Sequence, residues 1–205
     1  MYQALHATSI TLRDFIDAQI RADSFLYAPM APYRARSMVV SLNTPKEMED
    51  NNLEGVSVWL YRVVRDDQRL NDPPLRISAT QLRPAPLPLR LHYLVTPYTT
   101  RRNAGDPDTE QYLLGKVIQS LHTHAVMQGV DLRGELAGTT SCMNVRLETL
   151  PLDEMSRIWD ALDGTYQLSV SYEISVVNID SAREPDSLVP VVEVLAEIGQ
   201  IVRTP

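Results

Sequence analysis

The sequence predicts an α+β fold: a mixed, mainly antiparallel β-sheet with two or three helices packed on it. The main evidence is residues 166–176, where apolar Tyr, Leu, Val and Ile residues alternate strictly with Gln, Ser and Glu. A period of two is typical of an extended strand with one face on a core and a polar face in solvent. We expect this strand to cover residues 166–179. Three other segments show the apolar spacing of helices.

The first of these segments, residues 10–22, predicts an amphipathic helix. Its apolar face holds residues at i, i+3, i+4 and i+8, namely Leu12, Phe15, Ile16 and Ile20. Thr8, Ser9 and Thr11 are candidate N-caps. Residues 27–36 contain two prolines and are interpreted as a linker.

Two strands and two irregular segments follow. Residues 37–42 predict a short strand, and residues 56–65 predict a longer one. The longer strand is apolar on both faces, with Val56, Val58, Leu60 and Val64 on one and Trp59, Tyr61 and Val63 on the other. Two apolar faces predict a central strand that is covered on both sides. Residues 43–55 are turn-rich, and the proline- and charge-rich residues 66–88 predict a long surface excursion.

The second half of the chain predicts alternating strands and helices. Leu89, Leu91, Tyr93 and Val95 alternate with Arg90, His92 and Thr96 in a strand that Pro97 ends. Asp106 and Pro107 are a favourable cap and first residue for a helix that buries Leu113, Leu114, Val117, Ile118 and Leu121. Residues 143–148 alternate as a strand. A last helix turns Leu152, Met155, Ile158, Trp159 and Leu162 inward and ends at Gly164. The apolar residues 189–202 fit a strand or a helix.

Length and composition limit the class of protein. The 205 residues predict one domain over residues 1–180 and a C-terminal extension over residues 181–205, a candidate segment for binding another copy or another partner. The net charge of −7 argues against a duplex nucleic-acid partner. The single cysteine excludes an intrachain disulfide and fits reducing cytoplasm. We expect no signal peptide and no membrane insertion, because no apolar run is long enough.

Residue types capable of chemistry are present, but their spacing does not predict a reactive site. His92 is expected on a polar strand face without a partner acid nearby in sequence. His122 and His124 diverge by roughly 200° on a helix, so they do not form a metal pair. Cys142 has no adjacent basic residue that would lower its pKa. The sequence therefore predicts no catalytic residue, no metal site and no cofactor.

Two segments are candidate interfaces instead. Arg101 and Arg102 follow Tyr98 in a loop between a strand and a helix, in a chain that is acidic overall. The alternative to a solvated loop is a contact with an acidic surface on a partner. Val191, Val192 and Val194 lie in the apolar C-terminal segment, and either this segment or the long serine-faced strand could offer an edge for strand addition.

Residues 86–98, Pro-Leu-Pro-Leu-Arg-Leu-His-Tyr-Leu-Val-Thr-Pro-Tyr, resemble the signature strand of the cap, or tail-terminator, proteins of extracellular contractile injection systems of the antifeeding-prophage type. Three more segments resemble the same family, and they occur in the same order along the chain. They are Leu60–Val63 followed by Arg69, Leu70 and Asn71; Glu110, Leu113–Gly115, Leu121 and His122; and Trp159–Leu162 leading through Tyr166, Ser169, Val170 and Tyr172. The resemblance covers roughly residues 10–180.

This resemblance implies a tail-terminator-like fold and a structural protein without enzymatic activity. Such caps form a six-membered ring on the baseplate-distal end of the inner tube and contractile sheath, where they end polymerisation and anchor the last sheath layer. The implied partners are further copies of the chain, the inner tube protein and the sheath protein. The resemblance also implies that the chain assembles in the cytoplasm. The particle it belongs to is either released from the cell or retained inside it. Two alternatives stay open: a tail-completion protein of a contractile phage, and a small-molecule enzyme or binding domain that uses His92 with the proline-rich loop.

Overall fold

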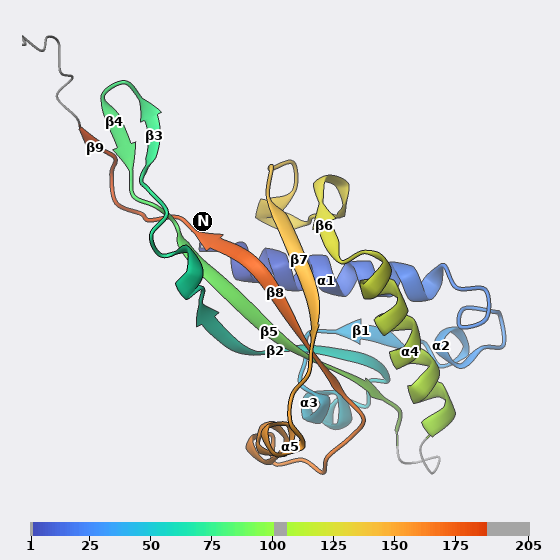
Figure 1. Ribbon diagram of the computed structural model, residues 1–205. Coiled ribbons are helices and arrows are strands. Elements are labelled where there is room, and N and C mark those ends of the chain that lie inside the picture. Colours follow the sequence, from blue (N-terminus) through green and yellow to red (C-terminus); the bar gives the residue numbers. More distant parts are fainter. Residues whose placement is uncertain (1, 101–105, 188–205) are drawn as a thin grey trace, which may run out of the picture.

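A six-stranded, mostly antiparallel sheet forms the centre of the molecule (Figure 1). The computed structural model describes residues 2–100 and 106–187. The strand order is β1-β2-β5-β8-β7-β6, and only the β1–β2 pair is parallel. The strands are β1 (Val39–Ser41), β2 (Gly55–Arg65), β5 (Leu87–Tyr98), β6 (Val126–Gln128), β7 (Cys142–Glu148) and β8 (Val170–Ile179). The predicted α+β class with a mixed, mainly antiparallel sheet is confirmed.

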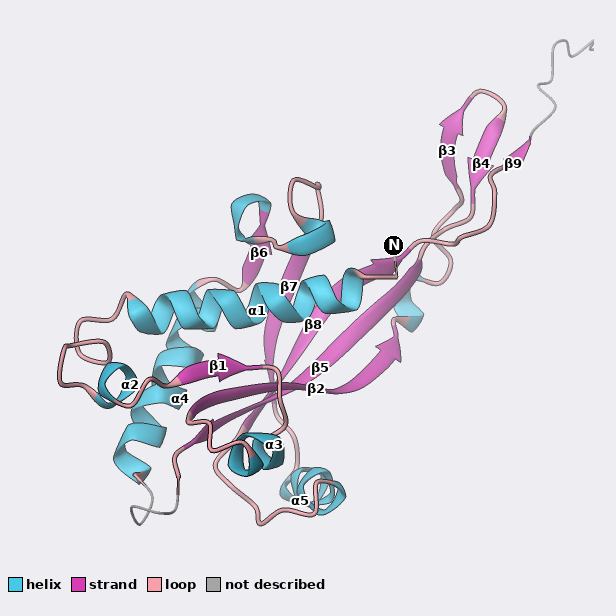
Figure 2. Cartoon of the chain, turned by 180° about the vertical axis from the view of Figure 1, so that it is seen from behind, coloured by secondary structure: helices cyan, strands magenta, loops and turns pink. Residues whose placement is uncertain are grey.

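Helices α1 (Ala4–Arg21) and α4 (Pro107–Thr123) lie on one face of this sheet, and α1 runs across the strands (Figure 2). Side chains of both helices and of every strand of the sheet share one core. Helix α1 starts six residues before the predicted helix, so the expected caps lie inside it. The hydroxyls of Thr8, Ser9 and Thr11 donate to the backbone carbonyls four residues earlier, which satisfies them in a buried position.

The predicted start of α4 is confirmed. The Asp106 carboxylate accepts a hydrogen bond from the Thr109 backbone N–H at 3.0 Å, and Pro107 occupies the first helical turn. The predicted apolar stripe faces the core, with Leu113, Leu114, Val117 and Leu121 buried.

The opposite face of the sheet carries α5 (Leu152–Ala161), which packs Met155 and Trp159 on Leu94 of β5. The indole N–H of Trp159 donates to Ser169 Oγ at 3.2 Å. Leu152 was predicted to face inward, but its side chain is 69% exposed because it occupies the first turn, beyond the contact with the sheet. A second helix near α5, α3 (Pro45–Asp50), was not predicted (Figure 1). Thr44 and Glu47 form a reciprocal capping box at its start.

Strand β8 departs from its prediction in two ways. It begins at Val170, and Tyr166 and Leu168 before it are exposed. Most of the side predicted to be polar is also buried, because Ser171 and Glu173 of the strand and Ser169 just before it are at most 8% exposed. Ile174 and Val177, three residues apart, both lie in the main core, since the register with β5 shifts between them. A bulge of this kind interrupts the period of two.

Strand β2 was predicted to be covered on both faces. This holds for its N-terminal half, where Val56 and Val58 are fully buried, but not for its C-terminal half, where Val63 is 43% exposed. The register with β5 shifts between Leu60 and Arg62. The bulge there places Val63 opposite Leu91 of the main core, so it shares a face with Leu60 and not with Trp59 as predicted.

Residues 66–88 contain a structured arm that projects from the body (Figures 1 and 2). Strands β3 (Leu75–Ser78), β4 (Gln81–Arg83) and β9 (Asp186–Ser187) form its three-stranded sheet, in that order. The predicted surface location is confirmed, since nearly all of these residues are exposed. The expected linker 27–36 contains a short helix, α2 (Pro32–Ala35). Within the described ranges, no helix is both long and apolar enough to cross a bilayer.

Candidate assembly surfaces and a buried polar cluster

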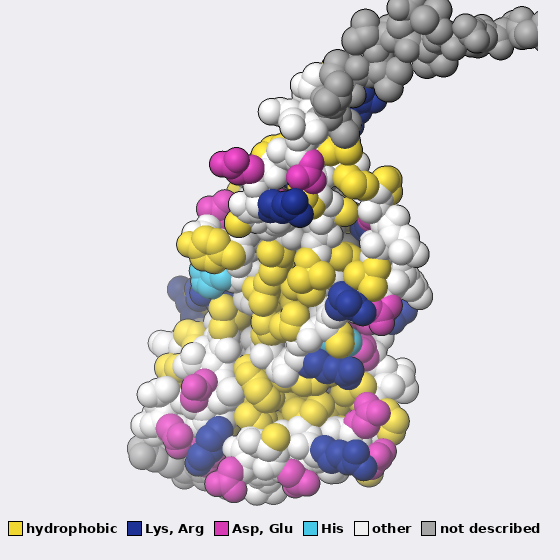
Figure 3. Space-filling view, turned by 90° about the vertical axis from the view of Figure 1, so that its left-hand side faces the viewer, with side chains coloured by type: hydrophobic (Ala, Val, Ile, Leu, Met, Phe, Trp, Pro, Cys, Tyr) yellow, Lys and Arg dark blue, Asp and Glu magenta, His cyan; other side chains and the backbone are white. Residues whose placement is uncertain are grey.

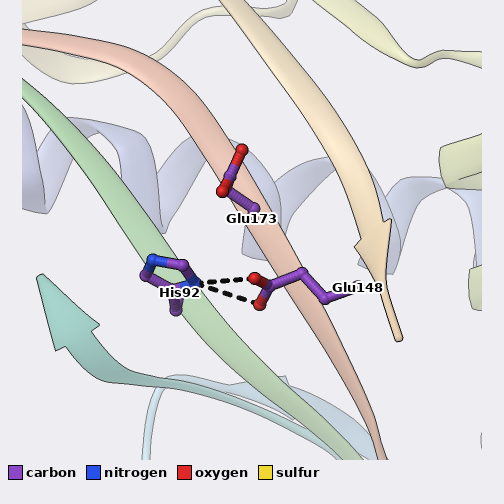
Figure 4. A group of neighbouring side chains, drawn as sticks. All are labelled: His92, Glu148 and Glu173. Atoms are coloured by element: carbon purple, nitrogen blue, oxygen red, sulfur yellow. Dashed lines mark hydrogen bonds and ion pairs between the residues drawn. The ribbon is translucent and has the colours of Figure 1, made fainter. Parts of the chain in front are cut away.

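Polar side chains from three adjacent strands meet on the sheet face opposite α1 and α4 (Figure 4). In the register, His92 of β5 lies opposite Glu173 of β8, and Arg146 of β7 lies opposite the same glutamate. Glu148 of β7 lies opposite Ser171 of β8. Directly paired residues point to the same face, so the pairing of the strands brings these side chains together.

Hydrogen bonds join this cluster into a network across four strands. His92 Nδ1 lies 3.0 Å from both carboxylate oxygens of Glu148 (Figure 4). The Ser171 hydroxyl donates to Glu148 Oε2 at 2.6 Å and lies 3.0 Å from the hydroxyl of Tyr61 on β2. His92 is only 6% exposed, so these contacts are made largely out of water. Such bonds fix the relative positions of the strands.

Arginines compensate the charge of the second glutamate. Glu173 is 7% exposed, and its carboxylate lies 3.3 Å from Nη2 of Arg146 and 3.7 Å from Nη1 of Arg90. Arg90 Nη2 also donates to Asp66 at 2.7 Å, and this hydrogen bond lowers the pKa of the Asp66 carboxyl. Each buried carboxylate therefore has a donor or a cation beside it, as buried charge requires.

The same donors also have the spacing of a metal-ligand set. One ligand atom from each of His92, Glu148 and Glu173 lies within 4.8 Å of the others. The guanidinium groups on Glu173, however, already supply positive charge and would repel a cation placed between the three residues. The other ring nitrogen of His92, Nε2, is buried without a hydrogen-bond partner among the described residues and points away from Glu148 (Figure 4). We interpret the cluster as a structural element of the sheet.

The open edge of β2 is a candidate surface for assembly. Strand β1 pairs only with residues 55–57 of β2, whereas β5 pairs along β2 as far as Arg65. Within the described part of the chain, no strand lies beside residues 58–65 on the side away from β5. Hydrophobic side chains form a broad band on the face of the molecule toward which β2 points (Figures 1 and 3). Unpaired backbone groups next to apolar side chains are typical of a strand-addition site.

The arm offers a second surface. Leu75 and Ile77 of β3 are 53% and 48% exposed, and neither hydrophobic cluster of the described residues includes a residue of the arm. A three-stranded sheet of this size, without a core, gains little stability by itself. A partner that covers Leu75 and Ile77 would supply the missing apolar contact.

A third surface lies between α4 and residues 24–33. Phe25 and Tyr112 are both more than half exposed, and their rings meet edge to face at 5.1 Å. Beside them is an apolar pocket of about 390 Å³ whose lining includes Tyr33 and Leu113. Exposed aromatic residues around an apolar hollow are common in protein interfaces.

The chain is similar to known proteins in sequence and in structure. The sequence model described as the Pvc16 N-terminal domain matches residues 7–193. The chain belongs to the Pvc16 N-terminal domain family. No curated protein matches the sequence.

Two solved structures resemble this Pvc16 N-terminal domain along nearly its whole length. One is described as the sheath/tube terminator of an extracellular contractile injection system, PVC, in the extended state. It has a TM-score of 0.60 and 21% sequence identity, and the match covers 96% of this chain and 65% of that one. The other is the tube-terminating cap of the anti-feeding prophage, with a TM-score of 0.60 and 18% identity over 97% of this chain and 61% of that one. The resemblance to cap proteins proposed from the sequence is confirmed at the level of family and fold, and the chain spans just under two thirds of both structures.

The predicted interface residues of this family member are only partly placed by the structure. Tyr98 ends β5 opposite Gly55 of β2 and is 4% exposed. Five others lie outside the described residues: Arg101, Arg102, Val191, Val192 and Val194. Their contact with a partner stays a prediction.

The cluster around His92 was not predicted from the sequence. Its partners Glu148 and Glu173 lie 56 and 81 positions away in the sequence, and no local pattern links them. The one available signal was that His92, Arg146 and Glu173 each occupy a polar position in a predicted strand. The predictions of no catalytic residue, no metal and no cofactor stay predictions.

Proposed function

We propose that this chain is part of a structural cap for a phage-tail-like contractile injection particle. In this role, copies of the chain form a ring at the baseplate-distal end of the inner tube and sheath. The ring stops further polymerisation and anchors the last sheath layer. The observation that carries the proposal is the match of nearly the whole chain to two structures described as terminators, within the family to which the chain belongs.

The surfaces of the molecule support this role. A tube end presents a symmetric ring of unsatisfied interfaces, and a terminator must match that symmetry by rotational closure. The open β2 edge, the uncovered arm and the apolar pocket beside Phe25 are three separate surfaces of one chain. A head-to-tail ring uses two different patches of each copy, so these three surfaces together with the C-terminal segment would serve the two neighbours, the tube and the sheath.

The finer features of the proposal follow from the same role. The ring is a homohexamer, it assembles in the cytoplasm, and its partners are the inner tube protein and the sheath protein. It acts without a cofactor, without nucleic acid and without enzymatic activity. The internal pairing of the charges around His92 supports this, because the network serves the sheet itself.

Negative-stain imaging of the purified full chain tests the proposal. Closed rings with a six-fold outline are the expected result, and rings added to growing tubes should bind one end and stop elongation. Cells that produce the particle but lack the gene for this chain should build tubes and sheaths of irregular length and low stability. Monomers that leave tube growth unchanged would contradict the proposal.

Reversal of the two loop arginines tests their predicted contact. The variant Arg101→Glu, Arg102→Glu should bind tube or sheath ends more weakly, because the loop is expected to meet an acidic partner. The matched control is Arg34→Glu, an exposed arginine of α2 whose guanidinium lies over the Tyr27 ring. Assembly that is equally normal in both variants would remove these arginines from the interface.

A further inference from the structure

We infer that the open edge of β2 accepts residues 188–205 of a second copy of this chain as an added strand. The inference deepens the proposed function, because it rests on copies of the chain meeting in a ring.

The edge beside residues 58–65 is the longest unpaired edge of the described sheets. It offers eight residues, whereas the outer strands β6 and β3 have three and four residues. Alternate N–H and C=O groups of such an edge point outward, and they are satisfied when a strand is added. Partly exposed Trp59, Leu60 and Val64 lie along it. The added strand would lie beside β2 on the same side as β1, beyond the end of the β1 pairing.

The sequence of the C-terminal segment contains a stretch that fits a strand of matching length. Pro190 and Gly199 bracket eight residues, Val-Val-Glu-Val-Leu-Ala-Glu-Ile. Proline and glycine are common at strand boundaries, and β-branched residues are favoured within strands. In an extended conformation Val192, Val194 and Ala196 share one side. The sequence by itself also allows a helix, and the open edge favours the strand.

The two segments have opposite charges. Arg62 and Arg65 lie on the open edge, and both are exposed. Arg62 forms no ion pair within the described ranges of the chain. The eight residues 191–198 carry Glu193 and Glu197 and no lysine or arginine, and Arg203 follows five positions beyond them. Charged residues and bulges on an edge strand discourage unspecific pairing. Arg65 is paired with Asp67, so Arg62 is the cation that favours a strand with carboxylates.

The path of the chain favours a second copy over the same copy. The pairing of β9 with β4 places Ser187 opposite Gln81, at the outer end of the arm. Figure 1 shows that this end lies away from the body and from the tip of β2. To reach its own edge, the segment would have to reverse and run back along the arm. We therefore assign the segment to the β2 edge of a neighbouring copy.

Photo-crosslinking of the full chain tests the inference. One preparation carries a photoreactive amino acid at position 194, and it is mixed with an isotopically heavy preparation of the unmodified chain before ring assembly. The expected product joins the light C-terminal peptide to heavy residues 58–65, as read by mass spectrometry. Crosslinks found only within light chains, in products with the mass of a monomer, would show that the segment inserts into its own copy. Crosslinks to other regions would show that the segment binds elsewhere. Both outcomes overturn the inference.

Charge exchange provides the second measurement. Arg62→Glu should lower the yield of this product about tenfold, and Glu193→Arg with Glu197→Arg in the same chain should restore it. The control Arg34→Glu should leave the yield unchanged. Negative-stain images of the same samples separate the two proposals. Rings that form without the 194-to-edge product overturn the inference and leave the cap function standing, whereas the absence of rings from the unmodified chain contradicts the function.

Discussion

The hydroxyl of Ser9 in α1 lies 2.8 Å from the phenol oxygen of Tyr93 in β5, and the two residues join the helix to the centre of the sheet. Tyr93 is fully buried, and burial raises the pKa of its hydroxyl. Ser9 also donates to the carbonyl of Leu5 at 3.0 Å. A buried polar pair of this kind specifies how α1 packs on the sheet, because a shifted helix would leave the buried Tyr93 hydroxyl without this partner, while Ser9 would keep its bond to Leu5.

Tyr93→Phe should lower the free energy of unfolding by about 1 kcal/mol, because it removes one buried hydrogen bond while the ring keeps its packing. Urea denaturation monitored by circular dichroism measures the change. In a double-mutant cycle with Ser9→Ala, the two losses should not add, since both remove the same bond. Additive losses would show that the two hydroxyls do not stabilise each other. Tyr166→Phe, at an exposed position, is the matched control.

Trp159→Ala should destabilise the chain by about 3–5 kcal/mol, because the indole is 2% exposed and packs on Leu94. Leu152→Ala on the same helix should cost less than about 0.5 kcal/mol, since Leu152 is 69% exposed. Chemical denaturation of both variants gives the comparison. A loss below about 1 kcal/mol for Trp159→Ala would mean that the helix does not bury this face.

Asp66→Asn should weaken the fold at neutral pH by about 2 kcal/mol, because the Asp66 carboxylate binds the Arg90 guanidinium at 2.7 Å and is nearly buried. The pKa of Asp66 is lowered by this bond, so its stabilisation is present above the ordinary aspartate range and is lost as the pH falls through the lowered value. Stability measured between pH 2 and pH 7 should therefore fall less steeply on acidification in the variant. Equal slopes in both proteins would argue against this contribution.

Tyr172→Phe should reduce the loss of stability at alkaline pH. Burial raises the pKa of Tyr172 to about 12. The folded chain therefore holds this proton more tightly than the unfolded chain, so stability is complete below the ordinary tyrosine pKa near 10 and is lost as the pH rises toward 12. Each such tyrosine should contribute a slope of ~1.4 kcal/mol per pH unit above pH 10. Burial also raises the pKa of Tyr33 and Tyr93, so the variant should keep a reduced slope. An unchanged slope would contradict the role of Tyr172.

Glu173→Gln should destabilise the chain by about 1–3 kcal/mol, because it removes the carboxylate that lies between Arg90 and Arg146. Addition of Zn²⁺ or of EDTA to the unaltered chain should leave its melting temperature unchanged, since the cluster is expected to be stable without a metal. A zinc-dependent increase that Glu173→Gln abolishes would identify the cluster as a metal site. His92→Ala is expected to assemble normally, and its main effect should be on stability.

Sequence patterns were sufficient for elements whose stability depends on local residues. The start of α4 was predicted because Asp106 and Pro107 act within one turn, and its apolar stripe repeats at helical spacing. The capping box of Thr44 and Glu47 carried the same kind of signal and was overlooked. The buried polar side of β8 could not be predicted, because a run of serines and one glutamate is equally compatible with solvent. Its burial depends on α5 and on strands distant in sequence.

The amino-acid sequence by itself determined the α+β class, the main helices and strands, and a family resemblance that the comparisons confirm. These features follow from periodicity, caps and local composition, which neighbouring residues fix. Only the tertiary structure decided that His92 meets Glu148, that two bulges change which side chains face the core, and that β2 keeps an open edge. These features depend on the pairing of strands from distant parts of the chain. The pattern of neighbouring residues in one strand does not specify which distant strand it pairs with.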